Sequence, residues 1–115
     1  MQKIFSMSYN VKSISVFERQ AKRLLKKYVS LKAELFQLVL ALRENPKQGI
    51  PIGNNCFKIR IAISSKGRGK SRGARVVTNF VITDDTVYLL TIYDKSEKDD
   101  LTNKELTELL KSIPE

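Results

Sequence analysis

Histidine and tryptophan are absent from this sequence of 115 residues, and cysteine occurs once, as Cys56. A single cysteine excludes an internal disulfide, and the lack of histidine excludes a zinc site built from His and Cys ligands. No stretch approaches the roughly 20 apolar residues that cross a bilayer. We therefore expect a soluble, cytoplasmic chain that has no cofactor and no His/Cys zinc site and transfers any proton without imidazole.

Acidic residues are also missing from the middle of the chain. Residues 45–83 carry eight Lys or Arg and no Asp or Glu, whereas residues 84–115 carry four and nine. The formal net charge of the whole chain is +9. A block this basic favours a polyanionic partner, because each neutralised phosphate releases condensed counterions. The plainer alternative is a solvated basic surface.

The first half of the chain predicts a helical hairpin. Ser15 and Glu18 have the spacing of a capping box, which places the start of a helix at Ser15. Apolar residues then recur at helical spacing from Phe17 to Tyr28 and again from Leu31 to Leu42. The prolines and glycine of ENPKQGIP, residues 44–51, end the second helix. Two helices joined by so short a turn form a hairpin.

The second half predicts strands and one more helix. Alternating apolar and polar residues mark strands in residues 9–14, CFKIRIAIS (56–64), ARVVTNFVI (74–82) and TVYLLTIYDK (86–95). Thr102 and Glu105 start the last helix with a second capping box. The order β-α-α-β-β-β-α predicts a single α+β domain over residues 1–115, with the N-terminal helical hairpin packed on one face of an antiparallel sheet.

The pleat of these strands predicts a polar face opposite the hairpin. If the apolar side chains, Tyr88 among them, face the hairpin, a second set points the other way. That set is Lys58, Arg60, Arg75, Asn79, Thr91, Tyr93 and Lys95. Val77 and Leu89 are predicted to point there too. Soluble monomers seldom leave a large apolar patch uncovered, so we expect a partner or the last helix to cover part of this face.

The loop SSKGRGKSRGAR, residues 64–75, contains the GKS that ends a phosphate-binding P-loop. The P-loop pattern needs a glycine where this chain has Ser64, and a helix where the sequence predicts a strand. The loop therefore does not fit a nucleotide triphosphatase. Its cations either serve solubility alone or extend the cationic face toward a single-stranded nucleic acid. They are Lys66, Arg68, Lys70 and Arg72.

Two motifs are distinctive as a pair: SKGRGKSRGARVV in the basic loop and LLTIYDKSE at the end of the last strand. Together with LLKKYVSLKAEL, the NP…G break and CFKIRIAIS, they resemble the RelE/ParE superfamily of type II toxins, in its RelE/HigB-like branch. The similarity covers the chain from about Ser8 to Ile113. One position departs from the pattern, which usually has two adjacent glycines before the xRV, whereas Arg72 precedes Gly73 here.

The resemblance implies a RelE-like fold and a ribosome-dependent mRNA endonuclease that works without a metal, by attack of the ribose 2′-OH on the adjacent phosphate. It also implies two partners, mRNA on the ribosome and a cognate antitoxin that often carries a helix-turn-helix domain. The expected catalytic residues are Arg75, Lys58, Arg60, Tyr93 and Lys95. The expected RNA-binding residues are Lys66, Arg68, Lys70, Arg72 and Asn79.

The catalytic set suits this chemistry, because the phosphorane transition state carries more negative charge than the ground state and fixed cations stabilise it. Arg75 and Arg60 are best suited to clamp phosphate oxygens in a bidentate way. Lys58 or Lys95 could transfer a proton if neighbouring cations disfavour its charged form. Tyr93 could stack on a base, orient the 2′-OH or join the proton transfer.

Several alternatives stay open. Asp94 and Glu97 are other candidates for the base, although acids after a strand more often serve as turn or cap residues. A ParE-like toxin would inhibit DNA gyrase without cleaving RNA, and a third possibility is an RNA-binding module without chemistry. The convergent cations favour the nuclease, because a gyrase inhibitor has no need of a phosphate-directed cluster.

Overall fold

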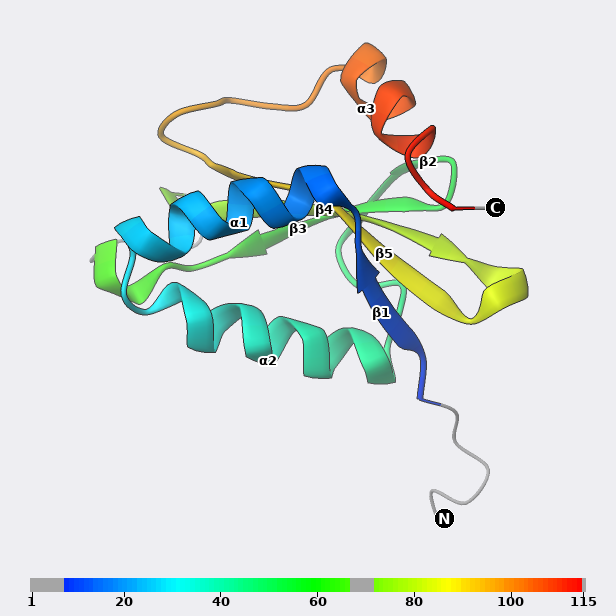
Figure 1. The fold of residues 1–115 in the computed structure, drawn as a ribbon, viewed down its shortest axis with the longest axis horizontal. Coiled ribbons are helices and arrows are strands. Elements are labelled where there is room, and N and C mark those ends of the chain that lie inside the picture. The colour runs from blue at the N-terminus through cyan, green and yellow to red at the C-terminus, as the bar shows by residue number, and fades with distance from the viewer. Residues whose placement is uncertain (1–7, 67–71, 115) are drawn as a thin grey trace.

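The computed structural model describes residues 8–66 and 72–114 and shows an α+β fold (Figure 1). The elements are β1 (Asn10–Ser13), α1 (Ser15–Lys27), α2 (Leu31–Glu44), β2 (Ile50–Gly53), β3 (Cys56–Ile61), β4 (Ala74–Val81), β5 (Thr86–Asp94) and α3 (Asn103–Leu110). Two short 3-10 turns cover Ser64–Lys66 and Ile82–Asp84. The strands form one sheet in the order β1-β5-β4-β3-β2. The expected α+β class and N-terminal helical hairpin are confirmed.

One strand, β2, was not predicted from the sequence. It lies at the edge of the sheet and contains Pro51, which lacks a backbone donor and is tolerated at such an edge. Asn54 and Asn55 turn the chain into β3 with φ angles of 56° and 58°, the left-handed backbone of a tight hairpin turn. The proline and glycines that shape this edge strand are also typical of a loop, so they concealed it.

The sheet is mixed, whereas a purely antiparallel one was expected. Strands β2 to β5 alternate in direction, but β1 pairs with β5 in parallel, with Asn10 opposite Thr86. After the helical hairpin, the next strand runs antiparallel to β1, and each following strand reverses direction. With the three strands that were expected after the hairpin, the last strand would run antiparallel to β1. The additional strand β2 adds one more reversal, so the last strand, β5, runs parallel to β1. The missed strand therefore explains the wrong pairing.

Helix α1 begins at Ser15 as predicted, but without the predicted capping box. Ile14 occupies the N-cap position, and no side-chain hydrogen bond caps the helix there. The Ile14 N–H donates to the Leu89 carbonyl oxygen at 3.2 Å, which keeps Ile14 extended and puts Ser15 inside the helix. Glu18 instead accepts a hydrogen bond from the Ser13 hydroxyl at 2.6 Å.

A β-bulge in β5 changes which side chains face the hairpin. Val77 pairs with Thr91 but Thr78 pairs with Leu89, which leaves Leu90 as the extra residue. Leu89 consequently lines the groove between α1 and α2, not the opposite face that simple alternation predicted. A bulge has no reliable signal in an apolar run, so the sequence could not reveal this shift.

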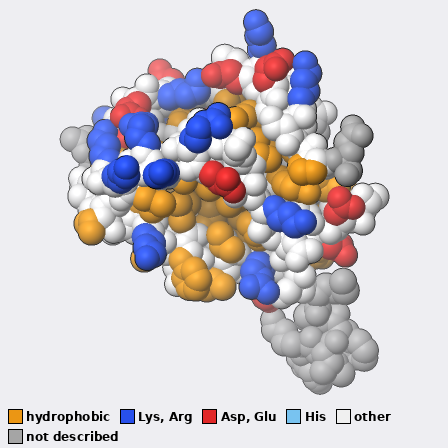
Figure 2. Space-filling model, in the orientation of Figure 1, with side chains coloured by type: hydrophobic (Ala, Val, Ile, Leu, Met, Phe, Trp, Pro, Cys, Tyr) orange, Lys and Arg blue, Asp and Glu red, His pale blue; other side chains and the backbone are white. Residues whose placement is uncertain are grey.

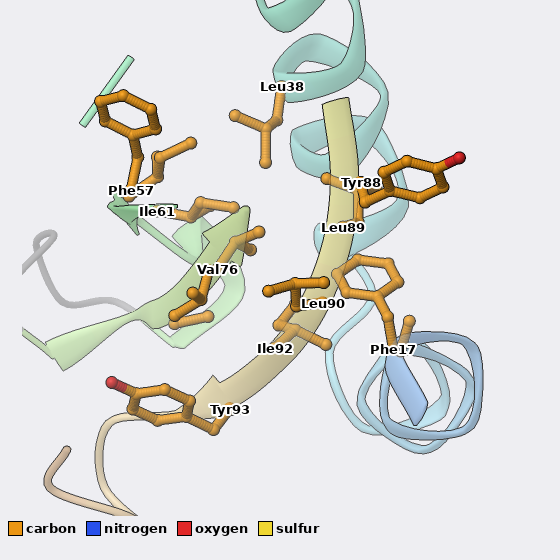
Figure 3. Packing of buried hydrophobic residues seen from close by; sticks show 14 of the residues in the cluster. Phe17, Leu38, Phe57, Ile61, Val76, Tyr88, Leu89, Leu90, Ile92 and Tyr93 are labelled. Atoms are coloured by element: carbon orange, nitrogen blue, oxygen red, sulfur yellow. The ribbon is translucent and has the colours of Figure 1, made fainter. Parts of the chain in front are cut away.

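The core lies between the helical hairpin and the sheet (Figure 3). Fully buried side chains come from both hairpin helices and from the central strands: Leu24, Leu31, Leu42, Val76, Leu90 and Ile92. Figure 3 shows Phe17 of α1 reaching toward Leu90 and Ile92 of β5. Tyr88 was predicted to join this set, but beyond the bulge it pairs with Asn79 and shares the face of Asn79.

Helix α3 covers part of the sheet face opposite the hairpin. The sequence predicted that either a partner or this last helix would do so. Figure 1 shows α2 and α3 on opposite sides of the strands. Thr102 and Glu105 form the predicted capping box at the start of α3. The buried Leu106 of α3 lines a hollow together with Lys58 of β3. Among the described residues, no helix is long and apolar enough to span a membrane.

Candidate functional site

Four of the five expected catalytic residues share the sheet face under α3. Arg60 pairs with Arg75 across β3 and β4, and Arg75 pairs with Tyr93 across β4 and β5. Lys58 lies two residues from Arg60 on β3, so its side chain points to the same side. The register thus places Arg60, Arg75 and Tyr93 in one row across three strands, with Lys58 beside them on the same face. We call these four residues, three cations and a phenol, the cationic row.

The two arginines of the cationic row differ in exposure. Arg75 is 5% exposed, and its Nη1 donates to the Ala74 carbonyl oxygen at 3.2 Å. Arg60 is exposed on the neighbouring strand. The Arg60 guanidinium is therefore the more accessible of the two, while the charge of Arg75 lies within the sheet face.

A carboxylate lies between Lys58 and Tyr93. The Asp100 Oδ1 atom is 3.1 Å from Lys58 Nζ and 3.4 Å from the Tyr93 hydroxyl oxygen, and it accepts the Leu101 backbone N–H at 2.8 Å. The Leu101 N–H and then the Lys58 ammonium hold the pKa of Asp100 below its ordinary value. Lys58 therefore contacts an acid, not the other cations that were expected to crowd it.

Tyr93 is held as a hydrogen-bond donor. It is 6% exposed, and burial followed by the negative charge of Asp100 raises its pKa to about 12, against the opposing effect of Arg75. A hydroxyl with that pKa stays protonated near neutral pH, so Tyr93 can donate to an anion but does not serve as a base. Its burial also leaves no open ring face for stacking on a nucleobase, which was one of its expected roles.

Lys95, the fifth expected catalytic residue, ties the end of the sheet together. Its backbone N–H donates to the Gly73 carbonyl oxygen at 3.0 Å, and its Nζ donates to the Asp99 carbonyl oxygen. The segment after β5 is thereby fastened to the start of β4.

Gly73, which precedes β4, lies against the end of β3. A Cβ at Gly73 would lie 1.9 Å from the Ile61 carbonyl oxygen, so the close approach of the two strands requires glycine.

A buried ion pair anchors the stem of the basic loop. The Asp94 side chain has no exposed surface and accepts hydrogen bonds from Lys66 Nζ at 2.8 Å, from the Ser96 hydroxyl at 2.6 Å and from the Tyr28 hydroxyl. Burial opposes ionisation of Asp94, but these bonds, first that of Lys66, outweigh it and hold the pKa of Asp94 well below its ordinary value. Lys66 also donates to the Arg72 carbonyl oxygen at 2.7 Å, which closes the stem.

The structure gives Lys66 a structural role, and its expected contact with RNA stays a prediction. Its side chain is 10% exposed and its ammonium group bonds the buried carboxylate of Asp94. Arg72 is exposed at the other side of the stem and remains a candidate. Arg68 and Lys70 lie outside the described residues.

Asn79, whose expected contact with RNA stays a prediction, holds a turn in the structure. It is 7% exposed, and its Nδ2 donates to the carbonyl oxygens of Asn54 at 2.9 Å and Asn55 at 3.4 Å. These two residues carry the left-handed backbone of the β2–β3 turn. The sequence could not show this role, because the pleat indicates the direction of a side chain and not its partner.

Neither Asp94 nor Glu97 faces the cationic row. Asp94 is sealed in the loop stem, and Glu97 pairs with Arg23 at 2.6 Å and with Lys27 at 3.1 Å on α1. Both acids stabilise the turn after β5, which was the structural alternative left open from the sequence. The acid that does reach the row, Asp100, was missed because nothing in the charged run EKDD distinguishes it from its neighbours. Within the described residues, no group of three or more His, Cys, Asp or Glu side chains is arranged to hold a metal ion.

Two further surfaces lie on the helical hairpin. Figure 2 shows Lys and Arg side chains gathered over α1. Those that line a shallow hollow there are Arg19, Lys22, Arg23, Lys26 and Lys27. The same view shows apolar surface between α1 and α2. Val29 and Phe36 lie in this groove and are 88% and 60% exposed.

Solved structures of bacterial toxins share this fold. A mutant of the Escherichia coli toxin RelE in the free state superposes with a TM-score of 0.59 and 17% identity, over 94% of this chain and 100% of that chain. The isolated E. coli RelE toxin gives 0.55 and 17% identity, over 90% and 97% of the two chains. A chain of the RelBE2 toxin–antitoxin complex from Mycobacterium tuberculosis gives 0.57 and 17% identity, over 76% and 92%.

These matches identify the class of fold: the chain has a RelE-like toxin fold, as the sequence resemblance implied. No family model matches the chain. At 17% identity, similarity of this kind defines the fold, and the placement in the HigB-like branch stays a prediction.

Proposed function

We propose that this chain is the toxin of a type II toxin–antitoxin system and that it cleaves mRNA on the ribosome in the cytoplasm. The observation that carries the proposal is the cationic row, in which Arg60, Arg75 and Tyr93 pair directly across three strands and Lys58 lies beside them. Sheet residues hold such a group in fixed geometry, and fixed charges stabilise a transition state better than mobile ones. The RelE-like fold supports the proposal.

The reaction we propose needs no metal. The ribose 2′-OH gives up its proton to water as it attacks the adjacent phosphorus, the bond to the 5′ oxygen of the next nucleotide breaks as that oxygen takes up a proton, and a 2′,3′-cyclic phosphate remains. Arg60, which is exposed, binds the phosphate oxygens, and the buried Arg75 stabilises the extra charge of the phosphorane. Tyr93 is protonated at neutral pH, and in this proposal it donates a hydrogen bond to a phosphate oxygen or to the leaving oxygen.

The partner we propose is a cognate antitoxin. The groove between α1 and α2 exposes Val29 and Phe36, and soluble chains seldom leave such apolar surface uncovered. Lys32 lines this groove, and Lys22 and Lys26 line the adjoining hollow, which shares lining residues with it. An acidic amphipathic segment would therefore match this surface in both polarity and charge. A related fold has been solved within a RelBE2 toxin–antitoxin complex.

Primer extension on a translated reporter message tests the nuclease. Induction of the wild-type chain should produce cuts in the message, and Arg60→Ala should reduce them about 100-fold, the usual effect of removing one transition-state donor. Arg43→Ala, an exposed arginine on α2, is the matched control and should cleave like wild type. Because Arg75 is buried, Arg75→Lys is the better variant there, as lysine keeps the charge but loses bidentate binding.

Three outcomes would overturn the proposal. Intact message together with inhibited DNA gyrase would identify a ParE-like toxin. Harmless expression with retained RNA binding would identify a module without chemistry. Full cleavage by Arg60→Ala would show that the cationic row is not where the RNA reacts.

A further inference from the structure

Asp100 occupies a position that is built for an anion. One oxygen atom of its carboxylate takes hydrogen bonds from Lys58 Nζ at 3.1 Å, from the Tyr93 hydroxyl at 3.4 Å and from the Leu101 N–H at 2.8 Å. The first two donors belong to the cationic row. We call the point between Lys58 Nζ and the Tyr93 hydroxyl the anion position.

A phosphate oxygen makes the same demands as a carboxylate oxygen. Both are anionic acceptors, and both are bound at similar distances by an ammonium group and a phenol hydroxyl. A phosphodiester that reaches Arg60 therefore finds its next donors, Lys58 and Tyr93, already bonded to an internal acid. We propose that Asp100 fills the anion position in the free protein and that a phosphate group must displace it to bind.

The structure allows this exchange without unfolding. The Asp100 side chain is 63% exposed, so rotation about its χ1 angle can carry the carboxylate into water. Helix α3 need not follow, because the capping box of Thr102 and Glu105 fixes the start of the helix independently of Asp100. A hollow of about 180 Å³ lined by Lys58, Asp100 and Leu106 adjoins the position.

The energetics also suit an exchangeable occupant. Partly exposed ion pairs are weak, since the charges remain hydrated and solvent screens their attraction. Asp100 is thus held firmly enough to be the resting occupant and loosely enough for a phosphate carrying more charge to replace it. Asp94 provides the contrast within the same chain, because its side chain has no exposed surface and its pair with Lys66 is not exchangeable.

The test compares Asp100→Asn with Asp99→Asn. Both changes remove one negative charge from adjacent residues, but only the Asp100 carboxylate bonds the cationic row. Inorganic phosphate is the probe, followed through the amide signals of Lys58 and Tyr93 by NMR. Asp100→Asn should bind phosphate about three- to fivefold more tightly than wild type, as expected for loss of a competing surface pair. Asp99 is exposed, so its charge is hydrated and partly screened at about 0.15 M salt, and Asp99→Asn should change the affinity less than twofold.

The results separate this inference from the function on which its biological meaning rests. If Asp99→Asn and Asp100→Asn raise the affinity for phosphate equally, the effect is one of general charge. If Asp100→Asn binds phosphate more weakly than wild type, Asp100 is part of the binding site. Either result overturns the proposal. Because the probe is inorganic phosphate, competition can be found even if no message is cut. In that case the anion position stands and the nuclease does not.

Discussion

Replacing Asp94 with asparagine removes the charge at the centre of the buried network while keeping the shape of the side chain. In Asp94→Asn, the Lys66 ammonium, on a side chain only 10% exposed, loses the carboxylate that lies 2.8 Å away. Removing one partner of a buried ion pair costs about 3–5 kcal/mol. The single oxygen of asparagine can still accept the Ser96 hydrogen bond, and the Tyr28 hydroxyl, which bonds the other oxygen of Asp94, can accept from the amide N–H instead. We therefore expect a loss near the lower limit, about 3 kcal/mol.

Urea denaturation measures this loss of unfolding free energy. Asp85→Asn is the matched control, because the same chemical change falls on an exposed residue whose φ of 49° suits asparagine. The control should stay within about 0.5 kcal/mol of wild type. A double-mutant cycle of Asp94→Asn with Lys66→Met should give a coupling of about 2 kcal/mol. A loss below about 1 kcal/mol, or no coupling, would refute the buried pair as an anchor.

The same pair determines the direction of acid sensitivity. The folded pKa of Asp94 is depressed, so its stabilising contribution is fully present above the unfolded pKa of about 3.9 and is lost as the pH falls from there toward the folded pKa. The acid limb of the stability curve should therefore be shallower in Asp94→Asn than in wild type. Parallel curves would contradict the ionised, hydrogen-bonded carboxylate.

Gly73→Ala should destabilise the fold by about 2 kcal/mol or more, because the new Cβ would lie 1.9 Å from the Ile61 carbonyl oxygen. An unchanged urea midpoint would contradict the close approach of β3 and β4. Thr102→Ala removes a formed capping box and should cost about 1 kcal/mol, whereas Ser15→Ala, at a helix start with the same spacing but no side-chain cap, should cost far less. Equal losses in thermal or urea denaturation would show that the two helix starts do not differ.

The parts of the fold that the sequence predicts are those governed by local pattern. Lys58 and Arg60 alternate with isoleucines, and this period of two places them on one face of a strand whatever the rest of the chain does. The strand-to-strand register of the assembled sheet then brings Arg75 and Tyr93 beside Arg60, and Tyr93 keeps its predicted face because it lies on the other side of the bulge from Tyr88 and Leu89. Most of the cationic row was therefore accessible from sequence.

The parts that escaped prediction depend on contacts between distant segments. Lys66 and Asp94 are 28 residues apart, and no local pattern indicates that a loop lysine turns inward to a strand-end aspartate. Asp100 meets Lys58 across 42 residues in the same way. The bulge at Leu90 is a further case, since it depends on how β4 and β5 fit each other. Local periodicity gives side-chain direction, whereas partner choice needs the assembled fold.

The uneven charge of the chain acquires a structural meaning through these partners. Residues 45–83 have no acid and residues 84–115 have an excess, and in the fold the acids of the later segment neutralise cations of the earlier one. Asp94 takes Lys66 permanently because the pair is buried, while Asp100 holds Lys58 at an exposed site where exchange is possible. Arg60 is exposed and has no ion pair within the described residues. The acids of residues 84–115 thus separate the cations into those buried in structural pairs, such as Lys66, those held by an exposed pair, such as Lys58, and those left exposed, such as Arg60.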